Sequence, residues 1–292
     1  VLAVVLLVAA AAVGYVYVAS ARLLARTYAI TSLPDVPVRS DPASLARGKY
    51  LADHVAMCAD CHDRDLGGKV VSDSAAMGRL ASANLTRGQG GIGAAYSNQD
   101  FARAILHGVK RDGRAVVFMP SANDRFTEAD FAALIAYVRS VPPVDRTPSP
   151  MSIGPIGRAL GVFTDFPLAP AARIDHDTVR FATPPDGADT TATGGYLVAA
   201  AGCQGCHGAQ YTGGGGPPPG ASNITPVGIG GWNEQQFLTA IRDHRRPDGT
   251  TIDEAMPRAY GEMADQDLRA IFTFLRTVPP AGEKTKRQTS AN

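Results

Sequence analysis

The sequence predicts an all-α protein in which two similar helical domains follow an N-terminal transmembrane helix. The first observation is an uncharged, almost wholly apolar run over residues 1–18. The second is an internal repeat, because the motifs of residues 48–143 return in the same order over residues 194–280. The third is that apolar residues recur at helical spacing in both copies, with no alternating pattern of useful length to indicate strands.

The apolar run is long enough to cross a membrane once. About 19 residues of helix at about 1.5 Å each nearly span a bilayer core. A secretory signal peptide is the competing interpretation, but its apolar region usually has only about 7–15 residues. We therefore expect residues 1–26 to form a retained membrane anchor. Arg22 and Arg26 follow the run, and the positive-inside tendency alone would place them in the cytoplasm.

Composition excludes some classes of partner. The chain has 292 residues with 28 basic and 27 acidic side chains, a formal net charge of +1. This balance gives no sign of a nucleic-acid partner. The cysteines are Cys58, Cys61, Cys203 and Cys206. All four fall inside one repeated motif, so none is left for a structural disulfide.

The repeat sets the expected domain limits. GKYLADHVAMCADCH is echoed by GGYLVAAAGCQGCH, NLT by NIT, one Met-Pro pair by another, and both copies end in a double proline. We expect one domain at residues 42–143 and the second at residues 193–281. Residues 144–192 form a Pro/Gly-rich linker, with one short helix near residues 156–162.

Helix signals can be read within the copies. Residues 45–57 and 195–201 lead into the cysteine motifs, and a helix over residues 99–106 stops at Gly108. In the first copy Thr127 and Asp130 resemble a capping box. The helix that they open runs to about Ser140, where a double proline ends it.

The motif Cys-x-x-Cys-His allows three chemistries, namely zinc binding, a redox dithiol or a covalent haem. Zinc needs about four ligands, and no further cysteines or paired histidines stand near either motif. A redox dithiol usually opens a helix after a strand and leaves the histidine unexplained. In a c-type haem site the two thiols bind the haem and the histidine binds its iron. The iron-binding histidines would be His62 and His207.

The sixth iron ligand is expected to be a methionine. Met119 and Met256 each precede a proline late in their copy, and a thioether suits both ferrous and ferric haem. His107 and His244 are alternative donors, which we interpret as solvated or propionate-side residues. Four other methionines are interpreted as packing residues, namely Met57, Met77, Met151 and Met263.

These motifs resemble a known family. GKYLADHVAMCADCH, NLT, GIG, the aromatic residue before SNQDF, DGR, the Met-Pro pair and LIAYVRSVPP are similar to the class I cytochrome c modules of membrane-bound alcohol and gluconate dehydrogenase cytochrome subunits. The resemblance covers both copies. It implies a compact helical fold around each of two covalent haem c groups and His/Met ligation at Met119 and Met256. Subunits of that family typically carry three such modules, and this chain shows two.

The expected function is single-electron transfer between periplasmic or membrane redox partners in a respiratory or related chain. The resemblance also implies haem attachment outside the cytoplasm, and hence a single-pass protein of the bacterial inner membrane with both haem domains in the periplasm. Expected partners are a quinol-oxidising complex, a terminal oxidase, a soluble cytochrome or a dehydrogenase within a larger complex.

Several alternatives to a plain electron carrier remain. The chain could be the cytochrome subunit of a periplasmic dehydrogenase, or a dihaem enzyme such as a peroxidase or thiosulfate-oxidising cytochrome, which needs an accessible iron. A haem-based sensor would need a signalling domain. Two basic groups near the Met-Pro loops are interpreted as solvated, with docking of an acidic partner or neutralisation of the haem propionates as the alternatives. Two aromatic residues are interpreted as walls of the haem pockets. The basic groups are Lys110, Arg111, Arg114, Arg242, Arg245 and Arg246, and the aromatic residues are Tyr96 and Trp232.

Overall fold

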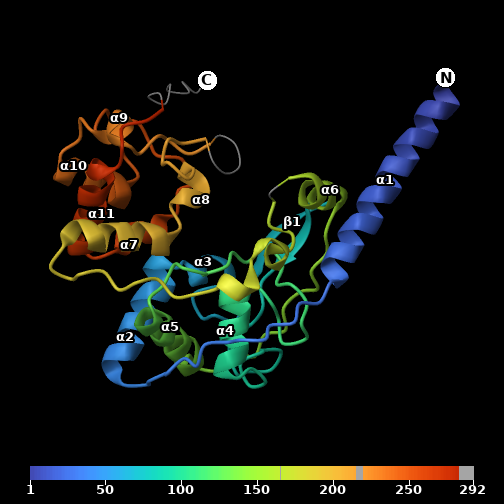
Figure 1. The fold of residues 1–292 in the computed structure, drawn as a ribbon, viewed down its shortest axis with the longest axis horizontal. Helices are drawn as coiled ribbons and strands as arrows, with labels where there is room; N and C mark the ends of the chain where they lie inside the picture. Colours follow the sequence, from blue (N-terminus) through green and yellow to red (C-terminus); the bar gives the residue numbers. More distant parts are fainter. Residues whose placement is uncertain (165, 215–219, 283–292) are drawn as a thin grey trace. The chain divides into compact units, whose positions relative to one another are not determined.

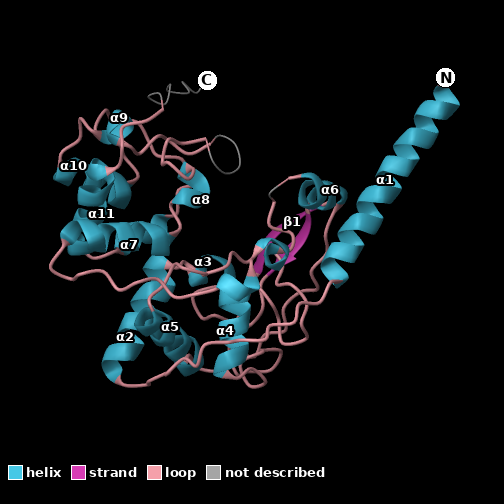
Figure 2. Ribbon diagram, viewed as in Figure 1, coloured by secondary structure: helices cyan, strands magenta, loops and turns pink. Residues whose placement is uncertain are grey.

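The computed structural model describes residues 1–164, 166–214 and 220–282 and is mostly helical (Figures 1 and 2). Its residues fall into two compact units. The first unit comprises Val1–Lys49, Cys58–Asp124 and Glu128–Phe181, and the second comprises Tyr50–Met57, Arg125–Thr127 and the chain from Ala182 on.

The N-terminal helix α1 spans Leu2–Ala25 and continues beyond the predicted apolar run. Its most apolar window has a mean hydropathy of 2.5, and none of that window is buried. By length and composition α1 can cross a membrane.

The helices of the first unit lie close to the predicted positions. Helix α4 begins with a capping box between Ser97 and Asp100 and ends at Gly108, whose φ of 62° gives the left-handed turn that favours glycine. The predicted last helix is α5, and the predicted linker helix is α6. The bounds are α2 Pro42–Tyr50, α3 Cys58–His62, α4 Asn98–His107, α5 Glu128–Ser140, α6 Pro155–Phe163, and the 3₁₀ turns η2 Pro170–Arg173 and η3 His176–Thr178.

The core of the first unit lies between α4 and α5. Phe131 and Ile135 of α5 are fully buried, and Phe101 and Leu106 of α4 are almost so. Phe131 also contacts the ring of Phe181, with ring centroids 5.4 Å apart. The helical spacing of these apolar residues in the sequence therefore reflects a buried face.

The prediction that the copies contain no strands is wrong at one place. Strands β1, Val70–Ser74, and β2, Gly78–Ala81, form an antiparallel hairpin after α3 (Figure 2). Every residue of β1 is exposed, so no face is buried to impose an alternating pattern. The linker supports this hairpin, since Ser152 N donates to Arg79 O at 3.0 Å and Gly154 N donates to Met77 O at 2.9 Å.

The second unit is built on a pair of helices, α7 and α11. Leu197 of α7 and Leu268 of α11 are buried between them, and Phe237 of α10 stacks on Phe272 of α11 with centroids 5.1 Å apart. The bounds are η1, a single π-helical turn at Leu51–Val55, α7 Thr190–Ala201, α8 Gln204–His207, α9 Pro226–Ile229, α10 Glu234–Asp243, the 3₁₀ turn η4 Arg258–Glu262, and α11 Asp265–Thr277.

Candidate functional site

Each cysteine motif occupies one helical turn. Cys58 and Cys61 lie three residues apart on α3, with His62 directly behind them. In the second unit Cys203 caps α8, which ends at His207. Residues three and four apart share a face of a helix, so the geometry places two thiols and one imidazole together in each unit. All four cysteines are free.

The two motif histidines make the same hydrogen bond. Nδ1 of His62 lies 2.9 Å from Ala83 O, and Nδ1 of His207 lies 2.7 Å from Ser222 O. A carbonyl only accepts, so Nδ1 carries the proton in both rings and Nε2 keeps its lone pair. Neither Nε2 is bonded by the described residues. This is how proteins orient an imidazole for a metal.

Burial sets the protonation of these groups. It lowers the pKa of both His62 and His207, which keeps the rings neutral and able to ligate. Burial raises the pKa of the Cys203 thiol to about 11, and burial together with the Asp60 carboxylate raises the pKa of Cys61. A redox dithiol instead works through a thiolate of lowered pKa. The raised pKa values of Cys61 and Cys203 therefore do not fit a redox dithiol.

A shared turn follows each motif. Gly68 N donates to His62 O at 2.8 Å, and Gly213 N donates to His207 O at 2.9 Å. Inside the turn Leu66 and Tyr211 adopt positive φ angles of 53° and 60°. Side chains other than glycine rarely adopt such angles. This strained residue could not be predicted from the sequence, because a leucine and a tyrosine share no local pattern.

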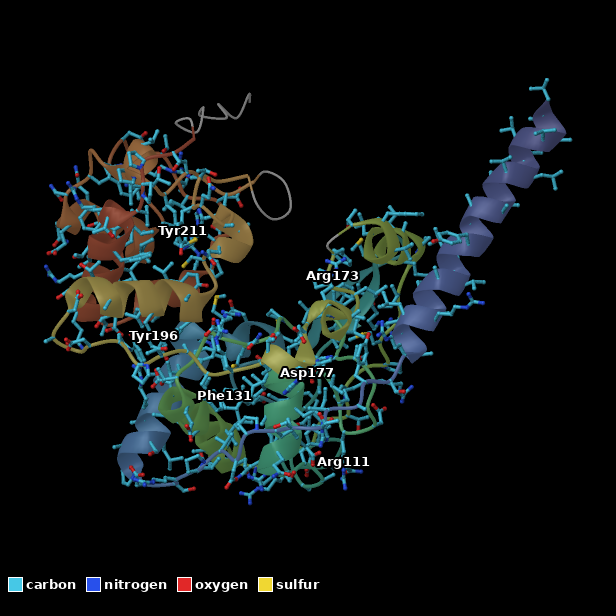
Figure 3. All side chains as sticks on the ribbon, in the orientation of Figure 1. Arg111, Phe131, Arg173, Asp177, Tyr196 and Tyr211 are labelled. Atoms are coloured by element: carbon cyan, nitrogen blue, oxygen red, sulfur yellow. The ribbon has the colours of Figure 1, made fainter. Side chains whose placement is uncertain are left out.

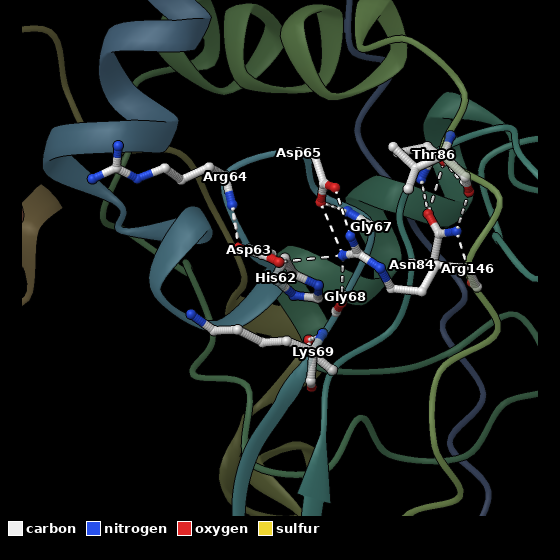
Figure 4. Close-up of polar contacts among 12 residues, drawn as sticks. His62, Asp63, Arg64, Asp65, Gly67, Gly68, Lys69, Asn84, Thr86 and Arg146 are labelled. Atoms are coloured by element: carbon white, nitrogen blue, oxygen red, sulfur yellow. Dashed lines mark hydrogen bonds and ion pairs between the residues drawn. The ribbon is translucent and has the colours of Figure 1, made fainter.

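An Asn-Thr pair ties the turn of the first unit to the start of the linker that follows α5. Asn84 is fully buried, and its Nδ2 donates to Val144 O at 2.7 Å and to Arg146 O at 3.0 Å (Figure 4). Its Oδ1 accepts from Thr86 Oγ1 at 2.8 Å. Ala83, the partner of His62, directly precedes Asn84, so this tie also positions the histidine.

The second unit repeats the tie. Asn223 Nδ2 donates to Ala281 O at 2.9 Å, and its Oδ1 accepts from Thr225 Oγ1 at 2.7 Å. Ser222, the partner of His207, directly precedes Asn223. The repeated NLT and NIT motifs directly follow Ala83 and Ser222 and could therefore have indicated these two positioning carbonyls.

Arg146 adds a further clamp in the first unit (Figure 4). Its Nη1 donates to Gly68 O at 2.9 Å, and its Nη2 donates to Asp65 Oδ2 at 2.8 Å. Asp63 lies 3.2 Å from the same guanidinium. The fork of donors on arginine suits this set of acceptors, so the loop behind His62 is held from the linker.

The two Met-Pro pairs lie in loops far along the chain from the motifs. Met119 lies between α4 and α5 and Met256 lies between α10 and η4, and both are half-buried. The loop at Met119 is tied to the linker, because Phe118 N donates to Pro167 O at 3.0 Å. The rings of Phe118 and Phe166 also meet edge to face, with centroids 5.0 Å apart.

The interpretation of His107 and His244 as solvated is wrong, since each is only 1% exposed. Nδ1 of His107 lies 3.2 Å from Nδ1 of His176. Neither ring nitrogen of His244 has a hydrogen-bond partner in the described residues. His244 takes the left-handed C-cap position of α10 that Gly108 takes on α4, which buries its ring against the unit.

The basic residues near the Met-Pro loops mostly bond within their own unit. Arg114 donates twice to Asp112 Oδ2, and Arg242 donates to the carbonyls of Gly261 and Met263. Arg246 donates to the carbonyl of Thr251. That these groups are solvated rather than docking sites stays a prediction.

Tyr96 and Trp232, which lie at matching positions in the two copies, accept equivalent hydrogen bonds. Arg139 Nη1 donates to Tyr96 O at 2.7 Å, and Arg276 Nη1 donates to Trp232 O at 3.3 Å. In each unit the last helix therefore holds the backbone of the aromatic residue. That these rings wall a haem pocket stays a prediction.

Family models define the class of protein. Residues 192–279 match the model described as cytochrome c, and residues 43–138 match the model described as cytochrome c oxidase, cbb3-type, subunit III. Both copies of the repeat are therefore cytochrome c domains. The domain class implies covalently bound haem c, which the paired thiols and the free Nε2 atoms fit.

The chain is homologous to cytochrome c subunits of dehydrogenases. It is 32% identical over 287 residues to the fructose dehydrogenase cytochrome subunit of Gluconobacter japonicus. It is 29% identical over 300 residues to the cytochrome c subunit of the quinone alcohol dehydrogenase of Gluconacetobacter polyoxogenes. Each comparison covers 88% of this chain, which spans 56% and 60% of the two relatives. A third relative is the gluconate 2-dehydrogenase cytochrome c subunit of Pantoea cypripedii, 35% identical over 107 residues, which are 32% of this chain and 24% of the relative.

Proposed function

We propose that the chain is a membrane-anchored dihaem c-type cytochrome that transfers single electrons between redox partners. The observation that carries this proposal is the matched pair of bonds from His62 to Ala83 O and from His207 to Ser222 O. Each bond fixes the imidazole tautomer that leaves Nε2 free for iron. Because both domains repeat this arrangement, both are built for the same task.

Each domain holds one haem. The two domains extend over residues 42–143 and 193–281. The haem iron supplies the chemistry by gaining and losing one electron. The cysteines would hold the haem through thioether bonds, and a neutral histidine imidazole and a methionine sulfur would bind its iron. A methionine ligand raises the reduction potential relative to other axial sets. The attachment residues are Cys58, Cys61, Cys203 and Cys206, and the iron ligands are His62, Met119, His207 and Met256.

The anchor is α1, which crosses the bacterial inner membrane once and leaves both haem domains in the periplasm. Its length and apolar composition support the crossing. Haem c attachment outside the cytoplasm supports the periplasmic side. The site of haem attachment outweighs Arg22 and Arg26, whose placement after the span would favour the cytoplasm.

A more specific candidate is the cytochrome subunit of a periplasmic dehydrogenase. Similarity over 88% of this chain to subunits of fructose and alcohol dehydrogenases favours it. In that role the two haems would accept electrons from a dehydrogenase subunit and deliver them to a membrane partner. A peroxidase-type enzyme is less well supported, because both domains carry a Met-Pro pair, which leaves no domain marked for an open iron.

Covalent haem content tests the proposal. The full chain, produced with a c-type haem maturation system, is expected to give two haems per polypeptide by pyridine haemochrome assay and by mass. Variants C61A and C206A are each expected to lose one thioether bond. A preparation with fewer than two haems would contradict the dihaem assignment.

Topology and partners need separate measurements. Protease added to spheroplasts is expected to digest both domains, and survival of either domain would place it in the cytoplasm. Copurification from gently solubilised membranes distinguishes the candidate partners, because a dehydrogenase, a quinol-oxidising complex and a terminal oxidase give different sets of bands.

A further inference from the structure

Helix α6 exposes an apolar stripe. Ile156 is 51% exposed and Phe163 is 65% exposed. These residues lie seven positions apart, and half-buried Leu160 lies between them on the same helical face. A surface helix normally turns its apolar stripe toward the core. We therefore expect the apolar stripe on α6 to be covered by something other than the protein's own core.

The opposite side of α6 is fixed to the first unit. Gly157 lies against the carbonyl of Met77 in the hairpin turn, and Gly161 lies against the side chain of Leu168. Both glycines are buried. Helix α6 is thus packed on one side and exposes Ile156 and Phe163 on another, so the stripe does not arise from a detached helix.

Helix α6 also packs against the C-terminal half of α1 (Figure 1). The rings of Tyr15 and Phe163 stack, with centroids 6.2 Å apart. Arg158 Nη1 donates to Ser20 Oγ at 2.9 Å, and its guanidinium lies 5.0 Å from the centre of the Tyr17 ring. These contacts place α6 at the level of residues 15–20 of α1.

That level corresponds to the edge of a bilayer. The uncharged, apolar run of α1 ends at Val18, within this level. Tyr15 and Tyr17 are 60% and 44% exposed, and Arg22 follows one turn later. Tyrosine and basic side chains gather where a membrane span meets water.

A pocket also lies between α1 and α6. A cavity of about 310 Å³ lies there, with Ala19 and Leu23 of α1 on one side and Val162 and Phe166 on the other. Arg173, which is labelled in Figure 3, also lines the cavity. Apolar walls with one cation suit the boundary between acyl chains and phosphate headgroups.

We propose that α6 is an interfacial helix that inserts Ile156 and Phe163 into the phospholipid leaflet where α1 ends. Amphipathic helices of this kind lie in the plane of the interface with the apolar face toward the acyl chains. The insertion adds a second membrane contact and holds the first cytochrome c domain against the membrane surface. The inference rests on the proposed crossing of the membrane by α1.

Photo-crosslinking in nanodiscs tests this placement. The full chain with both haems is reconstituted in phosphatidylethanolamine and phosphatidylglycerol, and benzoylphenylalanine replaces one residue at a time. In place of Phe163 it is expected to form lipid adducts several-fold above those at the exposed residue Ala129 of α5. In place of Leu7, within α1, it reports whether the anchor itself is in lipid.

The outcomes separate the two proposals. Lipid adducts at position 7 without adducts at position 163 would overturn the interfacial role of α6 and leave the anchor intact. An adduct between position 163 and a second protein chain would mean that another protein copy covers the stripe, which also overturns it. Absence of lipid adducts at position 7 would contradict the anchor. In a supporting result, adding the I156S change reduces the lipid adducts at position 163 several-fold.

Discussion

Gly194 of α7 lies directly against the main-chain carbonyl of Ala270 in α11, and a Cβ at this position would collide with that carbonyl. Gly48 of α2 meets the carbonyl of Ala133 in α5 in the same way. In both domains the helix before the haem motif therefore crosses the last helix at backbone contact. The repeated glycine is a requirement of this crossing.

Replacing Gly194 by alanine is expected to destabilise the second domain. An added methyl group forces the two backbones apart, and overpacking of this kind costs about 1–3 kcal/mol in the free energy of unfolding. Alanine is otherwise the better helix former by about 1 kcal/mol, so a loss of stability identifies the close contact. Thermal or denaturant unfolding of G194A measures it.

The matched control is G231A. A Cβ at Gly231 meets nothing within 4 Å, so its unfolding is expected to change by less than about 0.5 kcal/mol. G48A should repeat the loss seen for G194A in the first domain. Equal or greater stability of G194A than of the native protein would refute the crossing as described.

Replacing Asn84 by the isosteric aspartate is expected to destabilise the first domain. In N84D the amide that donates to Val144 O and Arg146 O is lost. A buried polar group left without its partner costs about 1–3 kcal/mol, and here two carbonyls lose theirs. We expect N84D to lose more than about 2 kcal/mol of unfolding free energy and to lower haem incorporation in the first domain.

Thr86 provides the control for this tie. T86S keeps the hydroxyl that donates to Asn84 Oδ1 and is expected to behave like the native protein. Denaturant unfolding and haem content per polypeptide are measured together. If N84D matches T86S in both, the tie does not position the haem loop.

The candidate haem-binding residues were easier to predict from the sequence than the residues that position them. Paired cysteines and a histidine are consecutive in the chain, so His62 and His207 could be read directly. The carbonyls that orient them belong to Ala83 and Ser222, and any residue carries a carbonyl. Only the position of these residues before the repeated Asn-x-Thr motifs distinguishes them.

The elements of the fold also differ in how well they could be predicted from the sequence. Helices α4 and α5 were predicted because each buries an apolar face, which leaves a periodic pattern. The hairpin of β1 and β2 was missed because β1 buries no residue. The burial of His107 was missed because its partner, His176, lies 69 positions away in the linker, and no local pattern reports such a pairing.

The pair of His107 and His176 is expected to make the first domain sensitive to acid. Burial, with the nearby charges of His176 and Arg103, lowers the pKa of His107 to about 4. In the unfolded chain the pKa is near the ordinary value of about 6.5. Between these values the unfolded state binds more protons, so stability falls as pH decreases from about 6.5 to 4.

The variant H107N tests whether His107 causes the acid sensitivity. Its amide can occupy the position of Nδ1 and keep the bond to His176 while removing the titrating ring. We expect lower stability than the native protein at pH 7, because a buried ring is lost, and a flatter decline toward pH 4. Thermal unfolding followed by circular dichroism measures both, and an unchanged slope would mean that another group causes the acid sensitivity.

The methionine ligands can be tested spectroscopically. M119L and M256L preserve side-chain volume but remove the sulfur, so each is expected to abolish about half of the sulfur-to-iron charge-transfer band of the oxidised protein. The reduction potential of the affected haem should fall, because methionine ligation raises it. Redox titration followed in the haem bands measures this shift.

Two other methionines serve as controls for these variants. Met151 is 40% exposed and Met263 is 1% exposed, and neither precedes a proline. M151L and M263L are therefore expected to keep the full charge-transfer band, although M263L can lower stability through packing by up to about 1.5 kcal/mol. A full band in M119L or M256L would show that another donor binds that iron, and His107 or His244 would then be the residue to replace next.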